Sequence, residues 1–111
     1  MLKVEVLLPN MSMMKFELIF TDHADQQMDL LEKTNDKRIV VKAVCKILGY
    51  METNLRHPSL NTHKYDAITG PNKEDVFESY AQNKTPGAYR IFWHYGPTKG
   101  KITILDISPH P

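Results

Sequence analysis

Apolar and polar side chains alternate along several segments of the chain, and this pattern indicates β-strands with one buried face. In residues 15–21, Phe16, Leu18 and Phe20 fall on one face of the expected strand. Residues 89–95 alternate in the same way, and residues 102–108 form an apolar segment that ends before Pro109. Residues 74–81 are also expected to form a strand.

Apolar residues at helical spacing follow the first strand and predict two consecutive helices. Thr21 or Asp22 is expected to cap the first, and Asn35-Asp36 to separate it from the second, which spans about residues 37–51. The tight link predicts an antiparallel helical hairpin. Its apolar positions are Ala24, Met28 and Leu31 in the first helix and Val40, Ala43, Val44, Ile47, Leu48 and Met51 in the second.

The remaining segments predict loops and turns. Residues 52–74 are rich in Asn, His, Pro and Gly and are expected to form a long loop, and Thr85-Pro86-Gly87 suits a type II turn. The order is then β-α-α-β-β-β, an α+β fold in which the helical hairpin packs on a small, mostly antiparallel sheet. We expect residues 1–13 to form an N-terminal extension, either an additional strand or disordered, and residues 14–111 to form the domain.

The composition is that of an ordinary globular protein and favours a cytoplasmic location. The 111 residues fit one domain, 41% of them are hydrophobic, and no apolar run is long enough to cross a membrane. Cys45 is the only cysteine, which excludes an internal disulfide and favours a reducing, cytoplasmic location. Apolar residues surround Cys45 at helical spacing, so we expect it to pack in the core.

Charge is distributed unevenly along a chain whose formal net charge is +1. Residues 16–36 hold six acidic side chains and one lysine, whereas residues 37–64 hold six lysines and arginines and one glutamate. Arg38, Lys42 and Lys46 are spaced at i, i+4 and i+8 and are expected to form a basic ridge on the second helix. This ridge either attracts a polyanion or complements the acidic helix as a solvated face.

The chemistry-bearing residues predict acid–base work rather than metal or serine chemistry. Neither the zinc-binding spacings of His and Cys nor a nucleophile elbow around serine occurs. Cleavage of RNA without a metal needs a base for the 2′-hydroxyl, a cation for the charged phosphorane and an acid for the departing oxygen. Each candidate side chain also suits surface solvation or a structural hydrogen bond. The candidates are Asp66, Glu78, His57, His63, His94, His110, Arg90 and Lys64.

Three short segments, taken in order, resemble the RelE/ParE toxin superfamily. Residues 35–42 (NDKRIVVK) are similar to the start of the second helix in YoeB-type toxins. Residues 89–95 (YRIFWHY) resemble the arginine-bearing strand of the superfamily, and residues 102–110 (ITILDISPH) resemble its closing strand with a terminal histidine. YoeB-type toxins have a second arginine on the strand that corresponds to residues 76–80, and this chain offers Glu78 or Ser79 near that position instead. The residue after the terminal histidine is often tyrosine in those toxins, and here it is Pro111.

This resemblance implies a ribosome-dependent, metal-independent mRNA endoribonuclease, without a cofactor or a membrane partner, that a cognate antitoxin neutralises. Arg90 matches the phosphate-stabilising arginine and His110 the histidine general acid. Asp66 falls near the general base, and His57 and His63 are further catalytic candidates.

The expected RNA contacts and partners follow from the same resemblance. Arg56, Lys64 and the basic ridge are expected to contact RNA, and the oligomeric state is open. The alternative is a non-catalytic or ParE-like member that acts on gyrase or another protein. Convergence of Arg90 and His110 would favour the nuclease.

Overall fold

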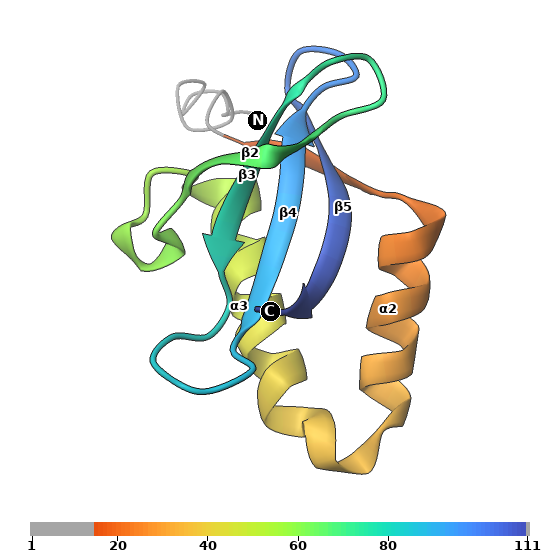
Figure 1. Ribbon diagram of the computed structural model, residues 1–111, viewed down its shortest axis with the longest axis vertical. Coiled ribbons are helices and arrows are strands. Elements are labelled where there is room, and N and C mark those ends of the chain that lie inside the picture. The colour runs from red at the N-terminus through yellow and green to blue at the C-terminus, as the bar shows by residue number, and fades with distance from the viewer. Residues whose placement is uncertain (1–14, 111) are drawn as a thin grey trace, which may run out of the picture.

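The computed structural model describes residues 15–110 as a five-stranded sheet with two helices (Figure 1). The sheet order is β1-β5-β4-β3-β2, with β1 parallel to β5 and every other neighbouring pair antiparallel. The expected α+β fold is confirmed. The extension predicted for residues 1–13 lies outside the described residues. The elements are β1 (Glu17–Phe20), α2 (Asp22–Lys33), α3 (Arg38–Thr53), β2 (His63–Thr69), β3 (Asp75–Tyr80), β4 (Tyr89–Tyr95) and β5 (Lys101–Pro109), with short 3-10 helices η1 (Asn35–Lys37) and η2 (Pro58–Leu60).

Local signals fix the helices and the turn before β4. The Thr21 hydroxyl accepts a hydrogen bond from the backbone N–H of Ala24 and so caps α2, as expected. The turn at Thr85-Pro86-Gly87 also forms: the Ala88 N–H donates to the Thr85 carbonyl at 3.1 Å, and Gly87 has a φ of +67°. This left-handed conformation favours glycine because it has no Cβ.

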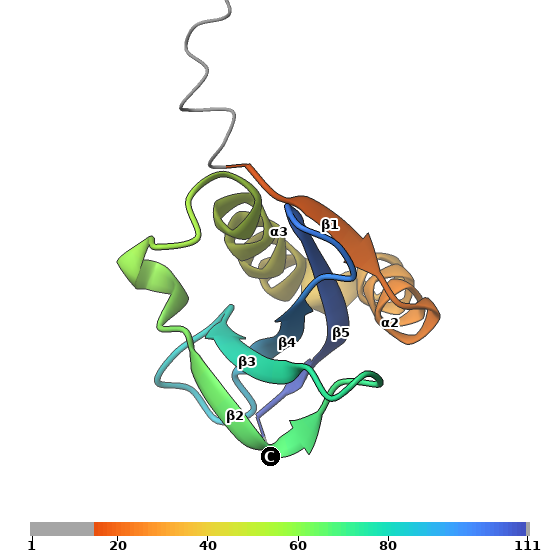
Figure 2. The ribbon, with the colours of Figure 1, turned by 90° about the horizontal axis from the view of Figure 1, so that it is seen from above.

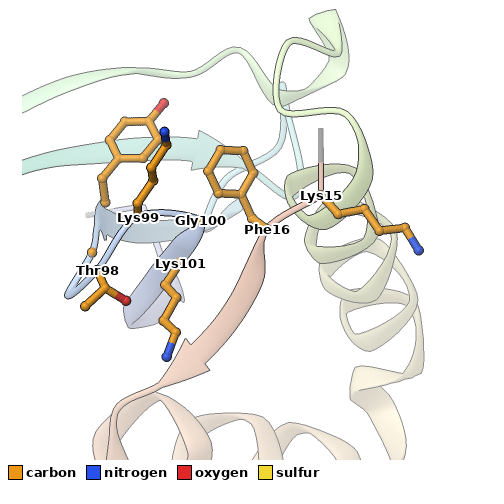
Figure 3. Close-up of a pocket in the computed structure, with 8 residues that line it drawn as sticks. Lys15, Phe16, Thr98, Lys99, Gly100 and Lys101 are labelled. Carbon is orange, nitrogen blue, oxygen red and sulfur yellow. The ribbon is translucent and has the colours of Figure 1, made fainter. Parts of the chain in front are cut away.

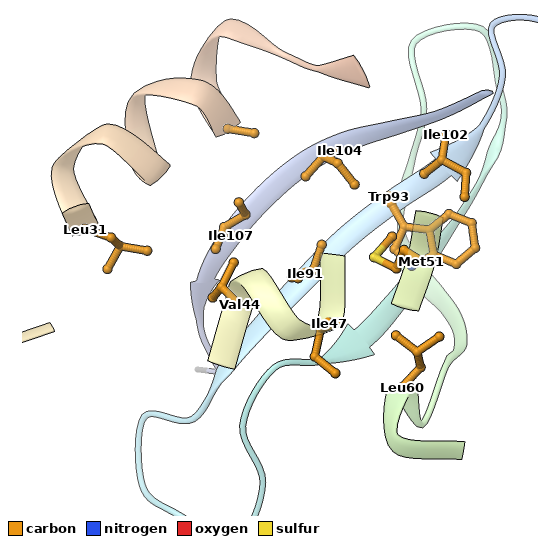
Figure 4. Close-up of a cluster of buried hydrophobic side chains, with 11 residues drawn as sticks. Leu31, Val44, Ile47, Met51, Leu60, Ile91, Trp93, Ile102, Ile104 and Ile107 are labelled. Carbon is orange, nitrogen blue, oxygen red and sulfur yellow. The ribbon is translucent and has the colours of Figure 1, made fainter. Parts of the chain in front are cut away.

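The hydrophobic core lies between the helices and one face of β4 and β5 (Figure 4). Figure 1 shows α3 passing behind the sheet, with α2 running beside β5. Since Ile91 and Trp93 face this core, alternation along β4 places Arg90, Phe92 and His94 on the opposite face. The main contributors to the core are Leu31, Val44, Ile47, Met51, Leu60, Ile91, Trp93, Ile102, Ile104 and Ile107.

Cys45 contradicts its expected place in the core, because the structure exposes it. The buried side chains of α3 are Val44, Ile47 and Met51, which lie along one stripe of the helix. Cys45 follows Val44 and is therefore rotated about 100° away from that stripe. Apolar neighbours in sequence surround the position, but they do not determine which way its side chain points.

The long loop expected over residues 52–74 is wrong for its second half, which contains strand β2. Figure 2 shows β2 at the edge of the sheet, beyond β3. Six of its seven residues are exposed, so the strand has no alternating apolar pattern to reveal it. Its pairing with β3 comes from backbone hydrogen bonds, which a pattern of side chains does not report.

Candidate active site

The strand register aligns two rows of polar and aromatic side chains on the sheet face opposite α3. His63, Glu78 and Phe92 are successive partners across β2, β3 and β4. In the next row Tyr80 pairs with Arg90, and Arg90 pairs with Ser108 of β5. His110 lies two residues beyond Ser108. Paired residues share a sheet face, so residues distant in sequence meet here.

Glu78 is the centre of this arrangement. Its side chain is only 3% exposed, and its carboxylate is approached by three basic groups. Oε1 lies 2.7 Å from His63 Nε2, whereas Oε2 lies 3.6 Å from Arg90 Nε and 3.7 Å from His110 Nδ1. Glu78, His63, Arg90 and His110 are called the Glu78 cluster below. A buried carboxylate needs such partners, because an unpaired charge is costly to remove from water.

Arg90 is held rigidly beside Glu78. Its Nη1 donates to the backbone carbonyls of Gln82 at 2.9 Å, Ala88 at 3.3 Å and Tyr89 at 3.4 Å. The Tyr80 ring lies against the guanidinium, with its centroid 3.7 Å from Cζ. The facing atoms Arg90 Nε and Glu78 Oε2 are both buried and have no hydrogen-bond partner in the structure. At the centre of the cluster, Arg90 Nε can therefore still donate a hydrogen bond and Glu78 Oε2 can still accept one.

The two histidines form the exposed rim of the cluster. The His63 side chain is 48% exposed and that of His110 is 51% exposed, so both are open to a ligand. The His110 backbone N–H donates to the Ala88 carbonyl at 2.7 Å, which fixes a chain end that would otherwise fray. His110 directs Nδ1 at Glu78, whereas His63 directs Nε2 at Glu78 and has Nδ1 3.2 Å from the Asn61 carbonyl.

Of the five residues that the resemblance marked as catalytic, Asp66 and His57 lie apart from the Glu78 cluster. Asp66 is 84% exposed on β2, and its carboxylate is 3.6 Å from Lys64 Nζ. His57 stacks on Tyr50, with ring centroids 3.7 Å apart, and its Nδ1 accepts the Ser59 N–H at the start of η2. The contacts of His57 are those of a structural residue. The catalytic roles expected for these two residues remain predictions without geometric support.

The expected RNA-binding side chains divide into two groups. Lys64 also lies 3.6 Å from Asp75, so two carboxylates neutralise it locally. Arg56 is exposed, as are the three residues of the basic ridge on α3. Lys46 of the ridge lines a hollow of about 360 Å³ together with Tyr80, whose ring covers Arg90. Lys46 and Tyr80 therefore line one hollow, although α3 lies on the opposite face of the sheet from the Glu78 cluster.

The central place of Glu78 was not predicted from the sequence, although a usable signal was present. A glutamate in the middle of a strand, between Phe77 and Ser79, is as unusual as the arginine near the start of β4. Glu78 and Arg90 carry opposite charges inside neighbouring strands, so each is most simply explained as the partner of the other.

Within residues 15–110 no group of three His, Cys, Asp or Glu side chains has a geometry that could hold a metal ion. No helix in this part of the chain combines the length and apolarity needed to span a membrane.

Comparisons with known proteins identify the fold. No family model and no curated protein sequence matches the chain. Solved structures do: a YoeB/ParE toxin from Agrobacterium tumefaciens aligns with a TM-score of 0.59 at 9% identity, over 86% of this chain and 100% of that one. The chain has the RelE/ParE toxin fold.

Two further structures support the same assignment. A YoeB dimer from Staphylococcus aureus aligns with a TM-score of 0.58 at 14% identity, covering 87% of this chain and 99% of its own. RelE in an archaeal RelE-RelB complex from Pyrococcus horikoshii OT3 aligns with a TM-score of 0.60 at 12% identity, covering 86% and 96%. The resemblance inferred from the three sequence segments is therefore confirmed at the level of the fold.

Proposed function

We propose that this protein is the toxin of a toxin–antitoxin pair and cleaves mRNA on the ribosome through the Glu78 cluster. The observation that carries the proposal is the approach of Arg90, His63 and His110 to one buried carboxylate. Two exposed imidazoles and a fixed guanidinium are the groups that metal-independent RNA cleavage requires. The fold shared with YoeB and RelE toxins is consistent with this chemistry.

In the proposed reaction, Arg90 stabilises negative charge on the scissile phosphate. Its bonds to three backbone carbonyls place the guanidinium before substrate arrives, so little reorganisation is needed in the transition state. Glu78 is a positioning residue, because its buried carboxylate orients both imidazoles and balances the charge of Arg90. A positioned acid or base typically contributes about 10²–10⁴-fold in rate.

The two imidazoles supply the proton transfers. His110 directs Nδ1 toward Glu78, which leaves Nε2 to act as the general acid that protonates the departing 5′-oxygen. His63 serves as the general base for the 2′-hydroxyl in its neutral form, with its proton on Nε2 toward Glu78 and an unprotonated Nδ1 that faces the substrate in place of the Asn61 carbonyl. The 2′-oxygen then forms its bond to phosphorus as the bond to the 5′-oxygen breaks, giving a 2′,3′-cyclic phosphate and a free 5′-hydroxyl.

The test combines growth arrest with mapping of mRNA 5′ ends on translating ribosomes. We expect His110→Ala and His63→Ala to lower the cleavage rate by about 10²-fold or more. His23→Ala is the matched control, because His23 is an exposed histidine that contacts Asp106 rather than Glu78. If wild-type protein cleaves no ribosome-bound mRNA, the nuclease proposal fails and a protein-binding role, as in the ParE branch, replaces it.

A substrate with a 5′-phosphorothiolate linkage separates the roles of the two histidines. Its sulfur leaving group departs without protonation, so it restores cleavage by a variant that lacks the acid. We expect rescue of His110→Ala but not of His63→Ala. Rescue of His63→Ala alone would exchange the two roles, and rescue of neither would show that proton donation to the leaving group lies elsewhere.

RNA would approach the cluster along the basic ridge. Arg38, Lys42 and Lys46 are exposed on α3, and Lys46 borders Tyr80 beside Arg90. Reversing all three charges is expected to weaken RNA binding and to reduce its dependence on salt. An unchanged salt dependence would identify the ridge as a solvated helix face.

We also propose that a cognate antitoxin holds the protein inactive. The support is the archaeal structural neighbour, whose RelE is bound to RelB. Co-expression with the gene adjacent to that of this protein should restore growth and yield a complex that co-purifies. A neighbouring gene product that neither binds nor restores growth would contradict this part of the proposal.

A further inference from the structure

A second candidate binding site lies at the far end of the sheet, where the β4–β5 turn meets β1. A hollow of about 520 Å³ opens there, lined by two aromatic side chains, a glycine-containing turn and three lysines. None of its lining residues is acidic. Figure 3 shows Phe16 between the side chains of Lys99 and Lys15, with Lys101 extending from the other side of the turn. The lining residues are Lys15, Phe16, Tyr95, Gly96, Thr98, Lys99, Gly100 and Lys101.

Backbone hydrogen bonds fix the walls of this basic hollow. The Phe16 N–H donates to the Glu52 carbonyl at the end of α3, and the Glu17 N–H donates to the Gly100 carbonyl. Across the turn, the Gly96 N–H donates to the Lys101 carbonyl at 2.8 Å. The lysines are therefore presented from a framework held by the helix and the sheet rather than from a loose loop.

Tyr95 provides an aromatic surface inside the basic hollow. The residue is 48% exposed, although its ring packs edge-on against Trp93 and its ring centroid lies 6.1 Å from that of Phe16. A half-exposed ring among cations is the combination by which proteins hold single-stranded nucleic acid, with bases stacked on the ring and phosphates paired with lysines. An acidic peptide would use the lysines but would leave the exposed ring without a matching group.

We propose that the basic hollow binds a segment of RNA distinct from the one that is cut. Tyr95 lies five residues beyond Arg90 on β4, a distance of about 17 Å at about 3.4 Å per residue. Tyr95 also shares its face with Trp93, whereas Arg90 faces the other side of the sheet. A strand at the Glu78 cluster would have to pass around the sheet end to reach the hollow. Two separate RNA contacts suit a substrate held within a large RNA assembly.

The choice of RNA as the ligand of the basic hollow rests on the proposed function, but a binding measurement tests the hollow separately from cleavage. The background is His110→Ala, so that RNA is not consumed, and the probe is a fluorescent, unstructured RNA oligonucleotide. Lys15→Gln with Lys99→Gln should reduce the slope of log affinity against log salt by about 1.4, at about 0.7 per phosphate contact on a single strand. Lys33→Gln with Lys73→Gln removes the same charge from exposed positions elsewhere and should leave the slope unchanged.

Substitutions of Tyr95 test the stacking contact. Tyr95→Leu should weaken RNA binding by about fivefold or more without changing the salt slope, whereas Tyr95→Phe should retain affinity. Equal salt slopes for the two lysine pairs would overturn the proposal. Loss of binding to a polyglutamate peptide, with RNA binding intact, would instead assign the hollow to an acidic protein partner. Normal RNA binding without ribosomal cleavage would refute the nuclease while leaving this site in place.

Discussion

Replacing Glu78 with leucine tests whether the buried carboxylate is the counter-charge of Arg90. The substitution removes the charge 3.6 Å from Nε and leaves a guanidinium whose side chain is only 8% exposed. Breaking a buried ion pair by removing one partner costs about 3–5 kcal/mol. Arg90 keeps its carbonyl partners and the Tyr80 ring, so we expect the lower end, about 3 kcal/mol.

Urea denaturation followed by the fluorescence of Trp93 measures this cost, since Trp93 is the only tryptophan and is 1% exposed. With a slope of about 1.5 kcal/mol per molar urea, Glu78→Leu should lower the unfolding midpoint by about 2 M. The double variant Glu78→Leu/Arg90→Met removes both charges and should recover to within about 1 kcal/mol of wild type. His63 and His110 are about half exposed and can be hydrated in either variant.

A double-mutant cycle of Glu78 and Arg90 also tests whether the two side chains interact. If the costs of the two single substitutions simply add, Glu78 and Arg90 are energetically independent despite their proximity. Glu78 would then act only on the histidines, and its loss should affect cleavage far more than the free energy of unfolding.

Three further substitutions test local features of the fold. Thr21→Ala should cost about 1 kcal/mol by removing the cap of α2, and Thr21→Ser should restore it in thermal unfolding. Ser79→Ala should cost about 1–3 kcal/mol, because it leaves the buried Trp93 Nε1–H without its acceptor at 2.9 Å, and an unshifted Trp93 emission would argue against this contact. The pKa of Glu74 is held below its usual range because the Asn72 N–H donates to its carboxylate, so its contribution to stability is present at neutral pH and is lost as the pH falls through that lowered value. Glu74→Gln should make the free energy of unfolding depend less on pH in the acidic range. The same pH dependence in the variant and the wild type would contradict this account.

Sequence patterns alone predict both helices and four of the five strands, β1, β3, β4 and β5. The stripe of α3, the cap at Thr21 and the alternation in β4 are local patterns, because each depends on residues within a few positions of one another. A helix or strand with one buried face shows its apolar pattern in the sequence, whichever other element it packs against. The three segments that resembled RelE/ParE toxins were informative for the same reason, and the fold they implied was found.

The remaining features depend on how the helices and strands pack against one another. β2 is an exposed edge strand that exists through its pairing with β3, and the outward direction of Cys45 depends on which side of α3 meets the sheet. The Glu78 cluster draws residues from three strands and the chain end, so its assembly follows from strand register, which no single segment contains. The sequence supplied Arg90, His110, His63 and Glu78 as candidates, and the fold buried the Glu78 carboxylate among the three basic side chains.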